Sequence, residues 1–98
     1  MRISLTGRHF DVDADLKAYV EKQIDKLNRY YHHIISVHVI LDAEKFRQRA
    51  EIVLALKKQT LKVQEVTSDI HSSIDRALKK LEGKLKRFEE KIKLHRKV

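Results

Sequence analysis

Residues 35–56 read ISVHVILDAEKFRQRAEIVLAL, and this stretch decides the fold. Apolar side chains recur at every second position in each half, which is typical of strands with one buried face. The positions predicted to be buried are Ile35, Val37, Val39 and Leu41 in the first run, and Ala50, Ile52, Leu54 and Leu56 in the second. The polar stretch 42–48 between the runs fits a hairpin connection. We therefore expect two neighbouring strands that present one face to a core.

A third strand is predicted directly after this pair, over residues 60–68. Lys58 and Gln59 can turn the chain, and Leu61 and Val63 continue the alternation. The polar Glu65, followed by an apolar residue at position 66, then breaks the pattern. We expect a bulge or the end of the strand there.

The longest periodic segment follows, and it predicts a helix to about residue 94. Asp69, or Ser68 before it, is a suitable N-cap. One apolar stripe runs through the segment at helical spacing: Ile70, Ile74, Leu78, Leu81, Leu85, Phe88 and Ile92. Gly83 lies inside it and costs about 1 kcal/mol relative to alanine. Because the stripe stays in phase on both sides, we expect the helix to continue through this glycine.

The chain before residue 35 adds one strand and one helix. Residues 2–7 alternate as a strand, and Asp13 is a plausible N-cap for a helix to about Tyr30. The core-facing stripe of that helix is Leu16, Val20, Ile24 and Leu27, joined by Gln23 and Tyr31. The predicted order is β-α-β-β-β-α in a single α+β domain over residues 1–98. A four-stranded sheet with two helices packed on one face buries both stripes.

The charge balance predicts a polyanionic partner. The chain has 22 Lys and Arg against 14 Asp and Glu, a formal net charge of +8. Residues 69–98 hold ten basic and five acidic residues, and so contribute +5 of this charge. A membrane surface is a weaker alternative, since the chain has no tryptophan for an interfacial anchor and the long helix needs its apolar face for the core. The alternating start has no signal-peptide character, and we expect a cytoplasmic protein.

Basic side chains gather on one side of each predicted helix. At 100° per residue, one flank of the second helix carries Arg76, Lys80, Lys84, Arg87 and Lys91, and the opposite flank carries Asp75, Glu82 and Glu89. On the first helix, Lys22, Lys26 and Arg29 share a flank. Solvated helix surfaces usually mix their charges, so this separation favours phosphate binding over mere solubility. If the helices pack side by side, both stripes could line one groove or ridge that tracks a phosphate backbone.

The sequence lacks the common catalytic motifs. It contains no Gly-rich phosphate loop, no nucleophile elbow, no His-Glu-x-x-His motif and no cysteine. His32 and His33 are expected to point apart in a turn, and His38 to lie on the outer face of its strand. We therefore expect no metal, no cofactor, no small-molecule substrate and no enzymatic activity. A small metal-dependent enzyme that uses these histidines is the rival hypothesis.

Several short stretches together resemble the ribosome hibernation-promoting factor family, which includes the ribosome-associated inhibitor protein Y. They are 3–9 (ISLTGRH), 19–22 (YVEK), 26–27 (KL), 33–39 (HIISVHV), 50–51 (AE), 69–70 (DI), 74–75 (ID) and 80–82 (KLE). The resemblance covers nearly the whole chain, in order. It implies a fold akin to a double-stranded-RNA-binding domain.

The resemblance also implies a function and a binding face. Members of this family bind the small ribosomal subunit and its rRNA at the decoding region, where they block mRNA and tRNA on idle ribosomes. The RNA-facing residues would be Lys22, Lys26, Arg29, Lys80, Lys84, Arg87 and Lys91. Gly83 and Glu65 depart from the family pattern, which puts one phosphate contact in doubt. The chain carries no C-terminal dimerisation domain, as expected for a short member or the N-terminal domain of a long one. A generic double-stranded-RNA-binding module is the alternative function.

Overall fold

The computed structural model describes residues 1–31 and 33–96, with side chains described as far as Lys91. Its elements are β1 (Arg2–Arg8), α1 (Ala14–Tyr30), β2 (Ile34–Ala43), β3 (Gln48–Leu56), β4 (Thr60–Thr67) and α2 (Ile70–Arg96). The predicted order β-α-β-β-β-α is confirmed. His32 and the side chain of Ile92, both used in the sequence predictions, lie outside the described residues.

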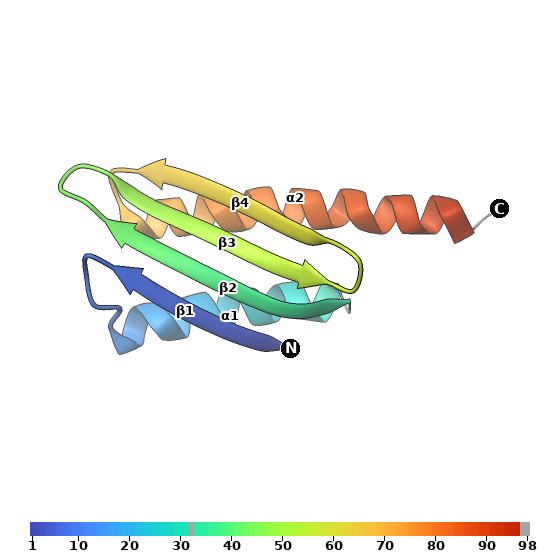
Figure 1. Cartoon of the computed structure of the whole chain (residues 1–98), viewed down its shortest axis with the longest axis horizontal. Coiled ribbons are helices and arrows are strands. Elements are labelled where there is room, and N and C mark those ends of the chain that lie inside the picture. The colour runs from blue at the N-terminus through green and yellow to red at the C-terminus, as the bar shows by residue number, and fades with distance from the viewer. Residues whose placement is uncertain (32, 97–98) are drawn as a thin grey trace.

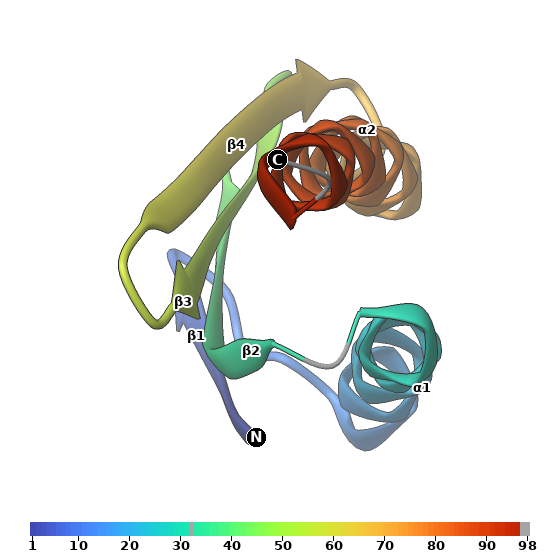
Figure 2. The same cartoon turned by 90° about the vertical axis from the view of Figure 1, so that its right-hand side faces the viewer.

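The four strands form one mixed sheet in the order β1-β2-β3-β4 (Figure 1). β1 runs parallel to β2, and the other two pairs are antiparallel. Both helices cover the same face of the sheet, α1 beside β2 and α2 beside β4 (Figure 2). No described helix or strand covers the opposite face (Figure 2). The predicted two-layer architecture is therefore confirmed.

Two details of the strands differ from the prediction. Ile35 is 54% exposed, and its neighbour Ile34 is buried instead. The register of β2 against β3 shifts between Ile34 and Ser36, so an irregularity at the strand's start reverses the facing of these side chains. The expected bulge or strand end near Glu65 was wrong, since β4 pairs with β3 without a register shift up to Thr67. The half-buried Glu65 lies opposite the small Ala50, which explains how the strand accommodates it.

Side-chain caps fix the start of both helices. The carboxylate of Asp13 accepts a hydrogen bond from the Leu16 amide at 2.8 Å. The carboxylate of Asp69 accepts one from the Ser72 amide at 2.9 Å, and hydrogen bonding to Ser72 lowers the pKa of Asp69. Both predicted N-caps are confirmed. α2 then continues through Gly83 as one helix, as predicted, and extends beyond the sheet (Figure 1).

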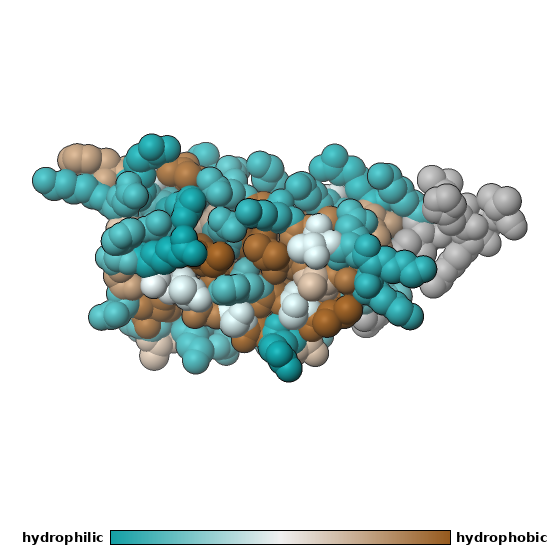
Figure 3. Space-filling view, in the orientation of Figure 1, coloured by the Kyte–Doolittle hydropathy of each residue, from teal (hydrophilic) through white to brown (hydrophobic). Residues whose placement is uncertain are grey.

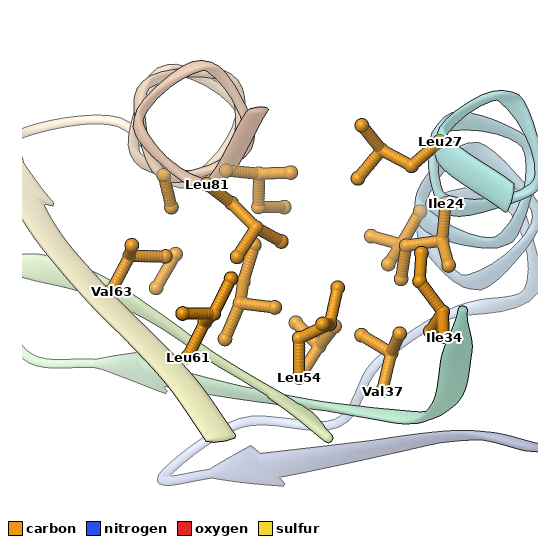
Figure 4. Packing of buried hydrophobic residues seen from close by; sticks show 14 of the residues in the cluster. Ile24, Leu27, Ile34, Val37, Leu54, Leu61, Val63 and Leu81 are labelled. Atoms are coloured by element: carbon orange, nitrogen blue, oxygen red, sulfur yellow. The ribbon is translucent and has the colours of Figure 1, made fainter. Parts of the chain in front are cut away.

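The core fills the space between the helices and the sheet (Figure 4). The helices contribute the buried side chains of Leu16, Val20, Ile24, Leu27, Ile74, Ala77, Leu81 and Leu85. The predicted stripe residues Ile70, Leu78 and Phe88 pack against this cluster while partly exposed. Both helices therefore have a fixed rotation about their axes, and this rotation decides where their charged flanks lie.

Candidate nucleic-acid interface

The basic flank of α2 comprises Arg76, Lys80, Lys84, Arg87 and Lys91. All are exposed except Lys84, which is half-buried because its ammonium group donates to the Lys62 carbonyl of β4 at 3.0 Å. Lys84, Arg87 and Lys91 line a shallow hollow together with Gln59 and Leu61, at the turn into β4. The basic flank therefore lies on the β4 side of α2.

The acidic flank of α2, formed by Asp75, Glu82 and Glu89, lies on the other side and faces α1. The Tyr19 hydroxyl of α1 donates to the Asp75 carboxylate, which raises the pKa of Tyr19. Burial, followed by the charges of Glu82 and Glu89, raises the pKa of the Tyr31 hydroxyl. These carboxylates thus lie toward α1, and the cations of the basic flank lie on the other side of α2.

The basic flank of α1, formed by Lys22, Lys26 and Arg29, is exposed. Lys26 lines the groove between the helices, whose other lining residues are Gln23, Leu27, Tyr30, Asp75, Leu78, Lys79 and Glu82. Lys22, Arg29 and the basic flank of α2 are not part of that lining. The idea that both stripes line one groove is therefore wrong, because the acidic flank of α2 occupies the groove's second wall.

The uncovered face of the sheet is the second possible binding surface (Figure 3). Apolar side chains lie near its middle, with hydrophilic ones around them (Figure 3). Its cations are partly neutralised, since Arg49 lies 3.4 Å from Asp42 and Lys62 lies 3.5 Å from Glu51. This face therefore has a weaker positive character than the basic flank of α2.

His38 and His33, two of the histidines that the structure describes, make separate contacts. His38 Nε2 lies 2.9 Å from the Thr6 hydroxyl, on the outer sheet face as predicted. His33 Nε2 lies 3.9 Å from a Glu89 carboxylate oxygen. Within residues 1–31 and 33–91, no three His, Asp or Glu side chains are grouped to hold a metal ion. Among the described helices, none has an apolar stretch long enough to cross a bilayer.

Comparison with known proteins places this chain in a family. Residues 3–93 match the family described as Sigma 54 modulation protein / S30EA ribosomal protein. The chain belongs to this family. The resemblance to ribosome hibernation-promoting factors, seen in the sequence, is thereby confirmed.

Relatives and solved structures agree with this assignment. A ribosome hibernation promoting factor of Azotobacter vinelandii is 32% identical over 91 residues, which cover 93% of this chain and 85% of the relative. The crystal structure of the Thermus thermophilus Protein Y N-terminal domain has a TM-score of 0.81 at 34% identity, covering 90% of this chain and 99% of that one. A ribosomal subunit interface protein from Coxiella burnetii shares the fold with a TM-score of 0.86 at 23% identity, over 92% and 99% of the two chains.

Sequence reasoning missed one surface feature of this family member, the tip of the β2–β3 hairpin. Phe46 is 80% exposed there, between the exposed Lys45 and Arg47. The connection was predicted only as a polar turn. An aromatic residue between two cations in that stretch was the available signal.

Proposed function

We propose that this protein is a ribosome hibernation factor that acts in the cytoplasm as a single ribosome-binding domain. It binds the small ribosomal subunit at the decoding region and mRNA channel, alone or within the whole ribosome, where it excludes mRNA and tRNA. Translation stops because the site is occupied, and no reaction is catalysed. No metal, cofactor, membrane or small-molecule substrate takes part.

The observation that carries this proposal is the family match over residues 3–93, which spans every strand and most of α2. Relatives matched over 93% of the chain are named ribosome hibernation promoting factors. A shared fold alone would not indicate a function. Here the same chain also has a net charge of +8, as a phosphate-binding surface requires.

The binding residues that we propose are the cations of the two basic flanks: Lys22, Lys26, Arg29, Arg76, Lys80, Lys84, Arg87 and Lys91. On α2 they are separated from the acidic flank, so the field of this helix attracts phosphates on its β4 side. The Lys84 ammonium uses one donor on the Lys62 carbonyl, which leaves two for phosphate oxygens and holds the group in place. Contacts of this kind fix position without reading sequence.

Competition on purified small subunits tests this function. We expect the protein to cosediment with subunits, and we expect pre-bound mRNA together with initiator tRNA to prevent it. We also expect the protein to inhibit translation of a reporter in a purified system. Simultaneous binding of the protein, mRNA and tRNA would contradict the occupancy mechanism.

A generic double-stranded-RNA-binding module is distinguished in the same assay. An excess of duplex RNA of unrelated sequence should leave cosedimentation unchanged if the ribosomal site is recognised by its shape. Displacement by a stoichiometric amount of duplex would favour the generic module instead.

A further inference from the structure

The tip of the β2–β3 hairpin presents an aromatic ring that neither the core nor the turn requires. Phe46 is 80% exposed, and it is not among the residues packed on the hydrophobic core. Two-residue hairpin turns favour Asn, Asp and Gly, whose backbones suit the turn. This turn has Lys45 and Phe46 instead. Single exposed apolar residues are common, so the case depends on what surrounds this one.

Hydrogen bonds hold the backbone that carries the ring in a closed turn. The Glu44 amide donates to the Arg47 carbonyl at 2.9 Å, and the Arg47 amide donates back to the Glu44 carbonyl at 3.4 Å. The side-chain amide of Gln48 donates to the same Glu44 carbonyl at 2.8 Å. Phe46 therefore projects from a closed turn, and the backbone loses little conformational entropy when the ring binds a partner.

The charges beside the ring suit a nucleic acid. Lys45 and Arg47 flank Phe46 in sequence and are both exposed. Two acidic residues, Glu44 and Asp42, line a hollow beside the hairpin with Arg47 and Arg49. Bases stack on aromatic rings while neighbouring cations contact the adjoining phosphates, a combination found in single-stranded nucleic-acid sites.

We propose that Phe46 stacks on an unpaired base of the RNA to which the protein binds, with Lys45 and Arg47 on the flanking phosphates. This rests on the proposed function, because it assumes that rRNA is the partner. It adds a second contact, since the hairpin lies at the end of the sheet opposite the C-terminal end of α2 (Figure 1). The basic flanks supply affinity for the backbone, and the ring fixes the position of one nucleotide.

Three proteins test this proposal on purified small ribosomal subunits: the wild type, Phe46→Leu and Phe46→Trp. Leucine keeps an apolar side chain and removes the ring, whereas tryptophan keeps a stacking surface. We expect affinity to fall about 5- to 150-fold for Phe46→Leu, the range given by loss of one stacked base. Phe46→Trp should bind at least as tightly as the wild type. All three should melt at the same temperature, because the ring is exposed.

Ultraviolet cross-linking of the wild-type complex identifies what the ring touches. After ribonuclease and protease digestion, mass spectrometry should find a nucleotide adduct on Phe46. No adduct at this residue, or a link from it to a ribosomal protein, would overturn the proposal, as would equal affinities of Phe46→Leu and wild type. Failure of the wild type to bind subunits would instead contradict the proposed function itself.

Discussion

The two glycines of the chain occupy very different surroundings. A Cβ atom on Gly7 would lie 2.7 Å from the Phe10 carbonyl oxygen and 2.8 Å from a methyl group of Val12. A Cβ atom on Gly83 would meet only the end of the flexible Arg87 side chain, at 4.0 Å. Gly7 thus allows the chain to fold back closely after β1, whereas Gly83 has no such role.

Replacement of each glycine by alanine should therefore change stability in opposite directions. Gly7→Ala should lower the free energy of unfolding by about 1–3 kcal/mol, because the backbone after β1 must shift. Gly83→Ala should raise it by about 0.5–1 kcal/mol, since alanine is the better helix former. Denaturant unfolding of both variants measures this. Equal effects of the same sign would refute the different roles given to Gly7 and Gly83.

The pair formed by His9 and Asp42 should make stability depend on pH. His9 Nδ1 lies 2.8 Å from Asp42 Oδ1, and this hydrogen bond raises the pKa of His9 and lowers that of Asp42. The contribution of His9 is present below its unfolded pKa of 6.5 and is lost as pH rises through the raised value. That of Asp42 is present above its unfolded pKa of 3.8 and is lost as pH falls through the lowered value.

The matched variant for this pair is His9→Asn. His9 has a φ of 65°, a left-handed conformation that asparagine tolerates well. We expect the stability difference between wild type and His9→Asn to be greatest between about pH 4 and pH 6.5, the two unfolded pKa values. The difference should shrink on either side of this window. A pH-independent difference would show that the ion pair contributes nothing.

At the scale of elements, the start of α2 is joined to β3 and β4 through one buried hydroxyl. Ser73 is fully buried; it donates to the Gln48 carbonyl and accepts from the Thr67 amide at 3.0 Å. This contact connects three elements at the point where the chain leaves the sheet. It also helps to set the rotation of α2, and hence the direction of its charged flanks.

Ser73→Ala should lower the free energy of unfolding by about 1–3 kcal/mol, because the Gln48 carbonyl and the Thr67 amide lose their hydrogen-bond partner. The control is Ser72→Ala. The Ser72 side chain is exposed, and its backbone amide keeps the bond to Asp69 in the variant. Its effect should be below about 0.5 kcal/mol. Thermal or denaturant unfolding distinguishes the two, and equal effects would contradict the role given to Ser73.

The elements themselves were predictable from the sequence because their apolar periods are long and their caps explicit. Asp13, Asp69 and the stripe through Leu81 gave α1 and α2 correctly. The facing of Ile34 and Ile35 was not predictable, since both are apolar and only the register with β3 selects one. The continuation of β4 past Glu65 depends on the small residue opposite it, Ala50 of β3. The sequence of β4 alone does not reveal this pairing.

The candidate site was predictable in part for a similar reason. A helical wheel separates the basic and acidic flanks of α2 without any tertiary information. It does not say which flank faces α1, because that depends on how the apolar stripe packs on the sheet. In the structure, the contacts of Tyr19 with Asp75 and of Lys84 with β4 show that the acidic flank faces α1. The exposure of Phe46 likewise depends on the turn's geometry.

At the scale of the whole molecule, binding by cations should depend strongly on salt. Each phosphate neutralised by Lys or Arg releases counterions, so the logarithm of affinity falls linearly with the logarithm of salt concentration. We expect a slope that corresponds to about five or more phosphates. Cosedimentation with small subunits over a salt series gives this slope. A slope near zero would mean that the basic flanks are only solvated surface.

Opposite changes on the two flanks of α2 test whether its basic flank binds the small ribosomal subunit. In one protein the exposed Lys80, Arg87 and Lys91 become Glu, and in the control Glu82 and Glu89 become Gln. Neither set includes a fully buried residue, so both proteins should keep the wild-type melting temperature. The affinity of each for purified small subunits is then measured across the same salt series.

We expect the charge-reversed protein to lose subunit binding. Any residual binding should have a salt slope smaller by about three, one for each lost phosphate contact. The Gln control should bind as tightly as the wild type or more tightly, because repulsion from rRNA phosphates is relieved. Wild-type affinity and salt slope in the folded, charge-reversed protein would contradict the account and would place the RNA-binding surface elsewhere, with the uncovered face of the sheet as the next candidate.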